Sequence, residues 1–498
     1  MDTGVVKRSR TFGTRQSTAR TRRPLGAYGG ALGVVWVVLF SVFLAQSAAA
    51  RNQPVALFAP PAQSVSALTT TTAETTTNLA PSRVTAYTLP PDLYAKARHL
   101  GRLEVLFYCL ESVYGVLVLL LVLRLRVAVR FRDWAERATR FRVLQAAIFT
   151  PLLLGTLAIF QFPIRIYWHW LDLAYGLSIQ RWSSWAWDLL KGEIVNWVIA
   201  SVAVWILYAI LRRSPRRWWL YFWLALIPLT VAMVFLQPLV VDPLFHHFEP
   251  LARNDPVLVS ELESVSRRAG VHIPPDRMFL MRASDKETVL NAYVTGFGGS
   301  KRVVVYDTTL ARMNSPQIAM VFGHEMGHYV LNHIRQGLFF AAALGFFILY
   351  FCYRVLNWIF AGTSGRWGIR VADDWASLPV LLLFLSVIGI FITPLASAFS
   401  RHIEHEADIY GLEITHGLTL DSAQVAAQSF QVLGQVDLED PAPSRFARLW
   451  LYDHPWIGDR IAFALHYDPW DHGEQPRYVH GVASAQALPA NISSPPAP

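Results

Sequence analysis

The segment VFGHEMGHYV, residues 321–330, places two histidines four residues apart with a glutamate beside the first. Residues four apart share one face of a helix, so His324 and His328 would lie side by side as two metal ligands. Glu325 would point near the same cavity, where a carboxylate can act as a general base toward water. The small Gly327 between the histidines leaves room for close packing behind the metal. The pattern predicts a catalytic zinc site.

A catalytic zinc ion usually has three protein ligands and an open fourth position, so one more ligand is expected downstream. Residues 400–411, SRHIEHEADIYG, can supply it. Glu404 and Asp408 are four apart, so the first could bind the ion while the second orients a ligand histidine. Three other side chains in this stretch could also be ligands, namely His402, His405 and Glu406. Spacing alone leaves the choice open.

The composition places this site in a membrane protein. Of the 498 residues, 53% are hydrophobic and 16% are charged. The formal net charge is +9, but the basic residues cluster at the ends of apolar runs and not on one soluble face, so a lipid bilayer is the expected partner and nucleic acid is not. Cys109 and Cys352 both lie in apolar runs, which argues against a disulfide framework or a cysteine metal site.

Seven apolar runs are long enough to cross a bilayer. The second contains Glu111, and an ionisable group at that depth needs a partner or a wet cavity. The first follows a basic arm and ends in alanines that would suit a signal peptidase, but its length favours an uncleaved span. The seven runs lie near residues 27–50, 105–123, 143–164, 194–211, 218–241, 336–353 and 375–400.

The elements that position the site lie between these runs. DPVLVSELESVSRRAG predicts an amphipathic helix closed by Gly270, RMFLMRAS a strand, and NAYVTGFGGSKRVVVYD a hairpin with its turn at 296–300. Ser315 and Pro316 suit the start of the helix that carries the histidines, with the serine as its cap. Two spans separate this helix from residues 400–411, so both halves of the site would face the same side of the membrane.

We therefore expect a predominantly α-helical multi-span membrane protein, with about seven transmembrane helices and an α+β zincin-type catalytic domain. The expected divisions are a basic N-terminal arm (1–26), the first span or signal anchor (27–50), a Thr/Pro-rich flexible link (51–90), the bundle of spans two to five (91–241), a first catalytic half (242–334), a transmembrane hairpin (335–400), a second catalytic half (401–482) and a disordered tail (483–498).

Four stretches of the sequence together resemble the type I CAAX prenyl endopeptidases, a family of integral-membrane zinc metallopeptidases. They are NAYVTGFGGSKRVVVYDTTL at 291–310, HEMGHYVLNH at 324–333, SRHIEHEAD at 400–408 and HPWIGDR at 454–460. The resemblance extends over most of the chain from about residue 88. It implies that one zinc ion is bound by His324, His328 and Glu404, with Glu325 as the catalytic base and Asp408 as an assisting acid.

The resemblance also implies a substrate groove. Asn291 and the following strand, with Ala292 and Tyr293, would line it, because a strand edge can hold an extended peptide by main-chain hydrogen bonds. His454 and Arg460 would act near the metal, where such a pair can stabilise an oxyanion. Taken without the family, Asn291 would be a turn or cap residue, His454 a loop histidine and Arg460 a partner in a surface ion pair.

The expected function is a membrane-embedded zinc metalloendopeptidase that hydrolyses peptide bonds with activated water. Its substrate would be a peptide or protein, and the resemblance implies a prenylated C-terminus. One alternative is a general quality-control protease of membrane proteins with the same mechanism. Another is a non-enzymatic membrane binding or transport protein with a structural zinc, against which the open fourth position argues.

Arginine-rich loops predict the orientation in the membrane. The loops at 124–142, 212–217 and 354–370 and the N-terminal arm lie on one side of a seven-span chain. Short loops rich in Lys and Arg stay in the cytoplasm, so the zinc domain would be extracytoplasmic. This departs from the eukaryotic members of the family, whose catalytic domain is cytosolic. We expect an integral protein of a bacterial inner, or cell, membrane.

Overall fold

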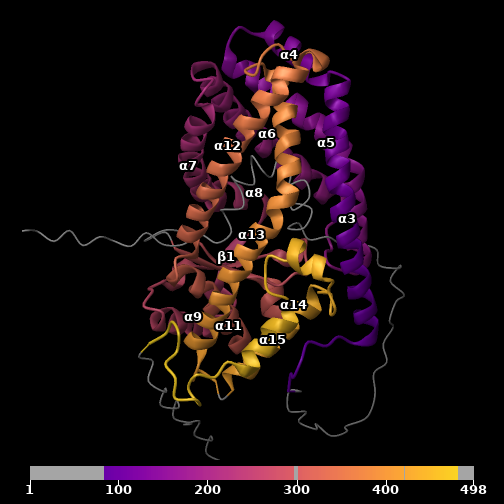
Figure 1. Ribbon diagram of the computed structural model, residues 1–498. Coiled ribbons are helices and arrows are strands. Elements are labelled where there is room, and N and C mark those ends of the chain that lie inside the picture. The colour runs from indigo at the N-terminus through magenta and orange to yellow at the C-terminus, as the bar shows by residue number, and fades with distance from the viewer. Residues whose placement is uncertain (1–82, 296–300, 420, 481–498) are drawn as a thin grey trace, which may run out of the picture.

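The structure is a computed structural model that describes residues 83–295, 301–419 and 421–480. Long helices form a bundle at one end, and shorter helices with a small sheet form a compact domain at the other (Figure 1). This confirms the predicted class, a helical membrane protein with an α+β domain. The N-terminal arm, the first predicted span, the flexible link up to residue 82, the turn at 296–300, and the tail lie outside the described residues.

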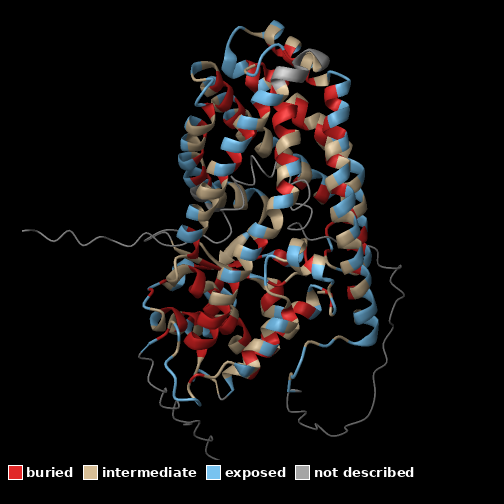
Figure 2. Ribbon diagram, in the orientation of Figure 1, coloured by how far each residue is buried: buried red, intermediate tan, exposed pale blue. Residues whose placement is uncertain are grey.

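Within the described ranges, five helices are long and apolar enough to cross a membrane, and they coincide with five of the predicted spans. A shorter apolar helix coincides with the span predicted at 218–241. Many large apolar side chains on these helices are exposed, as expected where lipid takes the place of water (Figure 2). The bundle helices are α3 (Pro91–Arg124), α5 (Arg142–Tyr175), α6 (Trp182–Arg213), α7 (Trp218–Leu236), α12 (His333–Trp367) and α13 (Leu378–Thr415).

Glu111 on α3 has the partner that its depth requires. The indole of Trp168 on α5 donates a hydrogen bond to the Glu111 carboxylate across 2.6 Å. Glu111 is buried, and the contact links two bundle helices. A polar group in the apolar part of the bundle is thereby satisfied within the protein.

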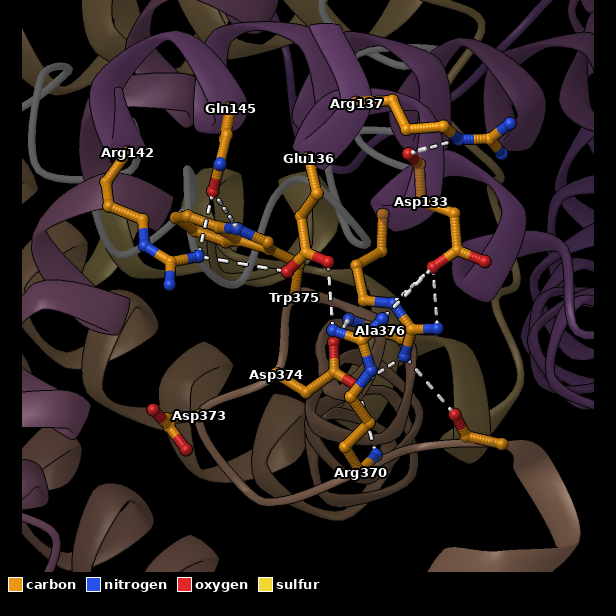
Figure 3. Close-up of polar contacts among 12 residues, drawn as sticks. Asp133, Glu136, Arg137, Arg142, Gln145, Arg370, Asp373, Asp374, Trp375 and Ala376 are labelled. Carbon is orange, nitrogen blue, oxygen red and sulfur yellow. Dashed lines mark hydrogen bonds and ion pairs between the residues drawn. The ribbon is translucent and has the colours of Figure 1, made fainter. Parts of the chain in front are cut away.

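Ion pairs close the end of the bundle that lies away from the sheet (Figure 3). Arg132 on helix α4 (Val127–Ala138) contacts Asp374 at 2.6 Å, and both side chains are buried. Arg132 also contacts Asp133 at 2.8 Å, and Arg370 contacts Glu136 at 2.9 Å. Since Arg370 and Asp374 belong to the connection between α12 and α13, these pairs fasten that connection to α4.

The sheet has the strand order β1-β2-β4-β3, in which β2 and β4 run parallel and the other neighbours antiparallel. The strand predicted from RMFLMRAS and the predicted hairpin are both confirmed, as β2 and as β3 with β4. Among the described residues, no strand pairs with the outer edge of β3. The strands are β1 (Phe248–Pro250), β2 (Met278–Met281), β3 (Ala292–Thr295) and β4 (Arg302–Tyr306).

Short helices surround the sheet. The predicted amphipathic helix is confirmed as α9, which ends just before Gly270, whose φ of 68° is the left-handed conformation that glycine adopts readily. The helices of this domain are α8 (Asp242–Phe245), α9 (Pro256–Arg268), α10 (Asp307–Arg312), α11 (Ser315–Val330), α14 (Ser422–Val436) and α15 (Ile457–His466). The single turns are η1 (Gln237–Val241), η2 (Leu251–Arg253), η3 (Pro275–Arg277), η4 (Ala283–Asp285), η6 (Trp375–Ser377) and η7 (Ala447–Leu451).

Two helices run without a break from the bundle into the compact domain. The division expected at residue 400 lies inside α13, and the one expected at 334 lies near the start of α12. Residues 83–90, expected as part of the flexible link, are instead held against α14, where Gln424 donates to the Val84 carbonyl at 3.0 Å. The Tyr87 hydroxyl donates to the Gly434 carbonyl at 2.7 Å, so a backbone group and a side chain of the link have partners that composition does not reveal.

Candidate metal centre

Helix α11 presents the two histidines of the predicted motif on one face. Its start differs by one residue from the prediction: Asn314, and not Ser315, is the cap. The Asn314 side chain accepts from the Gln317 backbone at 3.0 Å, and the Gln317 side chain accepts from the Asn314 backbone at 3.1 Å. This reciprocal capping box provides acceptors for two backbone N–H groups, those of Asn314 and Gln317. A cap at Ser315 would leave both groups without these acceptors. The Nε2 atoms of His324 and His328 are 3.1 Å apart.

Helix α13 brings Glu404 to these histidines. Its Oε2 atom lies 3.1 Å from Nε2 of His324 and 3.4 Å from Nε2 of His328. This oxygen is buried and, among the described residues, accepts no hydrogen bond of good geometry. Two imidazole nitrogens and a carboxylate oxygen that converge in this way form a donor set typical of a divalent transition metal. The residues present therefore fit a bound metal ion.

The other candidate ligands of residues 400–411 point elsewhere. His402 is 63% exposed, and the ring of His405 lies against Phe463 of α15. Glu406 faces His333 at 3.3 Å. Of the four candidates, Glu404 is the one whose carboxylate lies beside both histidines of α11.

Asp408 and Arg460 lie behind the metal centre. Oδ1 of Asp408 is 2.8 Å from Nδ1 of His324, on the side of the ring away from Glu404. The Arg460 guanidinium donates to both carboxylate oxygens of Asp408, at 2.7 and 2.9 Å. Arg460 also lies over the ring of Phe430, 4.2 Å from its centre. The two hydrogen bonds from Arg460 orient Asp408, which in turn orients His324.

Glu325 and His454 complete the centre. One ligand atom each of Glu325, His324 and His328 lie within 4.8 Å of one another. Burial raises the pKa of Glu325, which favours proton acceptance at a higher pH than for an exposed glutamate. Nε2 of His454 is 3.2 Å from Oε2 of Glu404, and its Nδ1 is 2.9 Å from Asp453. Desolvation opposes a charged ring, but these two carboxylates outweigh it and raise the pKa of His454 well above its usual value.

The electrostatics of the centre favour positive charge. Burial alone would lower the pKa of His324, but Asp408 and Glu404, on opposite sides of its ring, raise it to about 9. A ring held between two carboxylates can be stabilised by a proton or by a metal ion on its Nε2 atom.

The predicted substrate residues lie at the edge strand. The backbone of Asn291 is held by the Thr309 hydroxyl, which accepts from its N–H and donates to its carbonyl, each at 2.8 Å. Its side chain is exposed, Ala292 is buried, and the ring of Tyr293 lies edge-on to Tyr306. Strand β3 lies next to α11. The structure thus places β3, the outer strand of the described sheet, next to the helix that carries the histidines.

Two features of the centre were not identified from the sequence. Gly411 of α13 lies against the backbone of His324, and a Cβ atom there would be 3.0 Å from the His324 nitrogen. His333 contacts His328 through their Nδ1 atoms at 3.1 Å. Small residues four apart, Gly323 and Gly327, were a signal for the close helix packing. The contact between His333 and His328 had no such signal in the sequence, because residues five apart do not share a helix face.

Comparison with known proteins agrees with this geometry. The family described as Peptidase family M48 matches residues 252–468, and the one described as CAAX prenyl protease N-terminal, five membrane helices, matches residues 71–247. Among relatives, the Uncharacterized metalloprotease YhfN of Bacillus subtilis is 33% identical over 341 residues, which cover 68% of this chain and 77% of the relative. The chain belongs to peptidase family M48.

A second relative is CAAX prenyl protease 1 of Saccharomyces cerevisiae, which is 26% identical over 340 residues, 65% of this chain and 73% of that protein. The fold is similar to that of S. mikatae Ste24p in its crystal structure. The TM-score is 0.63 at 21% sequence identity, and the match covers 89% of this chain and 100% of that chain. This M48 peptidase is an integral-membrane zinc metalloendopeptidase, which confirms the predicted function and excludes the non-enzymatic alternative.

Proposed function

We propose that the ion of this peptidase is a single Zn²⁺ held by His324, His328 and Glu404. The observation that carries this proposal is the spacing of the three ligand atoms, 3.1, 3.1 and 3.4 Å. Ligand atoms about 2.1 Å from a tetrahedral zinc ion are roughly 3.4 Å apart, so the side chains stand nearly where that geometry requires. Three protein ligands leave a fourth position for water or substrate, as in catalytic zinc sites.

The surrounding residues then have distinct roles. A bound zinc ion supplies Lewis acidity, which polarises a carbonyl and lowers the pKa of water. Glu325 accepts the proton of the attacking water and transfers it to the leaving amine. His454 donates a hydrogen bond to the oxyanion that develops on the scissile carbonyl. Asp408 holds His324 with Nδ1 protonated and Nε2 free to bind the ion, and Arg460 holds Asp408 in place.

The substrate is proposed to bind as an extra strand on β3. The outer edge of β3 can pair with an extended peptide, while Asn291 fixes the peptide carbonyl with its exposed amide. Relatives named CAAX prenyl protease support a protein substrate with a prenylated C-terminus. A general membrane quality-control peptidase is the second candidate, since the same catalytic groups would serve it.

Peptide hydrolysis by the purified chain in detergent tests the zinc assignment and the preference for a prenylated substrate. A quenched peptide should be cleaved, the activity should disappear with a chelator, and Zn²⁺ should restore it. A prenylated CAAX peptide should be cleaved faster than the same peptide without the prenyl group. Activity that survives the chelator would contradict the zinc assignment, and equal rates on the two peptides would favour the quality-control function.

The zinc domain is proposed to face the extracytoplasmic side of a bacterial cell membrane. Arginines gather at the opposite end of the bundle, around α4 and the connection from α12 to α13, and such loops remain in the cytoplasm. A cysteine introduced near residue 490 can be probed on intact cells with an impermeant thiol reagent. Because Cys109 is exposed, the experiment needs a Cys109→Ser background. Labelling only after permeabilisation would place the domain in the cytoplasm.

A further inference from the structure

A second chain of polar side chains leads away from the metal centre through His333. This residue is 1% exposed and begins α12, directly after the break between α11 and α12. At the break, Asn332 has a φ of 58°, in the left-handed region that asparagine tolerates better than most residues. In an unbroken helix, residues five apart point roughly 140° away from each other. The break instead turns His333 back, so that its Nδ1 lies 3.1 Å from Nδ1 of His328.

The direction of this contact follows from the role of His328. Its Nε2 faces His324 and Glu404, and an Nε2 that binds a metal must carry a lone pair and no proton. A neutral imidazole has one N–H, so the proton of His328 is on Nδ1 and is donated to Nδ1 of His333. The proton of His333 is then on Nε2, which lies 3.3 Å from Oε2 of Glu406. This distance allows a hydrogen bond, although the angle in this structure departs from that of a well-aligned one.

The C-terminal segment holds Glu406. Its Oε1 accepts a hydrogen bond from the Tyr478 hydroxyl at 2.8 Å. The backbone of that segment is fixed by the buried Glu413, whose Oε2 accepts from the N–H groups of Tyr478 and Val479 at 2.7 and 2.8 Å. The other oxygen of Glu413 accepts from the Arg477 N–H and from the Tyr467 hydroxyl. One carboxylate thus secures three successive backbone amides, a strong and specific attachment.

We propose that His333, Glu406 and Tyr478 form a positioning relay for His328, through which residues 477–479 help to build the metal centre. Asp408 contacts His324 directly, whereas Glu406 acts on His328 through His333. The relay rests on the proposed assignment of His328 as a ligand. Replacing a residue that orients a ligand in this way typically lowers metal affinity by about 10- to 100-fold.

Metal affinity, and not activity alone, tests the relay. The full chain in detergent is stripped of metal and titrated with Zn²⁺ against a coloured chelator, and the rate of Zn²⁺ release is measured. Glu406→Ala and His333→Leu should weaken Zn²⁺ binding by about tenfold or more. His333→Asn should recover most of the affinity of His333→Leu, because the amide oxygen can accept from Nδ1 of His328. The visible spectrum of the Co²⁺ form should shift in His333→Leu and return toward that of the unchanged protein in His333→Asn.

Matched variants distinguish an effect on the position of Glu406 from a general effect on folding. Tyr478→Phe removes the hydroxyl that donates to Glu406 and should speed Zn²⁺ release, whereas Tyr467→Phe removes a hydroxyl that donates to Glu413 and should not. His402→Ala, at an exposed residue 3.9 Å from Glu406, should also release Zn²⁺ at the unchanged rate.

The His328→Ala variant makes the possible failures distinguishable. If it loses Zn²⁺ while the His333 and Glu406 variants bind it with unchanged affinity, the relay is refuted and the ligand assignment stands. If His328→Ala itself binds Zn²⁺ with unchanged affinity, the proposed ligand set is wrong. Equal weakening by Tyr467→Phe and Tyr478→Phe would show that the segment acts only by supporting the fold, which also refutes the relay.

Discussion

Replacing Gly327 by alanine should weaken metal binding. Gly327 lies on α11 where it crosses α13, and a Cβ atom there would be 2.9 Å from Cβ of Tyr410 and 3.1 Å from Cα of Ala407. Ordinary contacts are 3.4–4 Å, and one of the two contacted atoms belongs to the backbone. The added methyl group therefore has to push α13 away by about 0.5 Å, because closely packed helices have no free volume to absorb it.

The expected energies follow from this displacement. Overpacking costs about 1–3 kcal/mol, and exchanging glycine for alanine inside a helix returns about 1 kcal/mol, so the net loss of unfolding free energy is about 0–2 kcal/mol. Glu404 precedes Ala407 by less than one turn of α13, so its carboxylate moves with the helix. Metal–ligand distances tolerate about 0.2 Å, and a shift of about 0.5 Å should lower Zn²⁺ affinity at least tenfold, or about 1.4 kcal/mol.

Gly192 provides the control for this prediction. It also lies inside a helix, α6, but a Cβ atom there would meet nothing within 4 Å. Gly192→Ala should therefore leave Zn²⁺ affinity unchanged and stabilise the fold by up to about 1 kcal/mol. Thermal unfolding in detergent and Zn²⁺ titration against a chelator measure both quantities. Unchanged Zn²⁺ affinity in Gly327→Ala would refute the argument that close contact of α11 and α13 positions Glu404.

Three further predictions concern single side chains. Glu325→Gln should keep the bound metal, because no proposed ligand is lost, yet lower turnover by about 10²- to 10⁴-fold; equal loss of metal and activity, measured side by side, would show that Glu325 is structural. Burial raises the pKa of Glu287 to about 7, so the folded protein binds an extra proton and loses stability as pH rises from about 4.5 to 7. Glu287→Gln should therefore raise thermal stability at pH 8, by at most about 3 kcal/mol, and leave it unchanged at pH 4, whereas equal effects at both pH values would contradict burial as the cause. Asp374→Ala should cost about 1–3 kcal/mol of unfolding free energy, because the buried Arg132 loses its buried partner and keeps Asp133, without changing Zn²⁺ affinity at the distant end of the molecule; a negligible change in unfolding temperature would contradict this.

Much of the fold could be predicted from the sequence because it depends on local patterns. Long apolar runs become helices, since a bilayer requires the backbone to satisfy its own hydrogen bonds. The strand at 278–281 follows from a short apolar run, and the hairpin follows from two strand-like runs on either side of a glycine-rich turn. The helix around His324 and His328 follows from its capping residues, although the cap is Asn314 and the prediction was Ser315. The arrangement of His324, Glu325 and His328 is likewise local, because helix geometry alone places them on one side.

Only the tertiary structure decides which distant residues join them. Glu404 and Glu406 are chemically alike and two residues apart, so they point roughly 160° apart around α13, and no local rule tells which one faces the histidines. That choice depends on how α13 crosses α11, and the crossing depends on backbone contacts at Gly327 and Gly411. In the same way, His333 reaches His328 because the chain turns at Asn332. A sequence pattern specifies the direction of a side chain relative to its own helix, whereas a metal centre requires atoms of two helices to meet within a few tenths of an ångström, and only packing determines that distance.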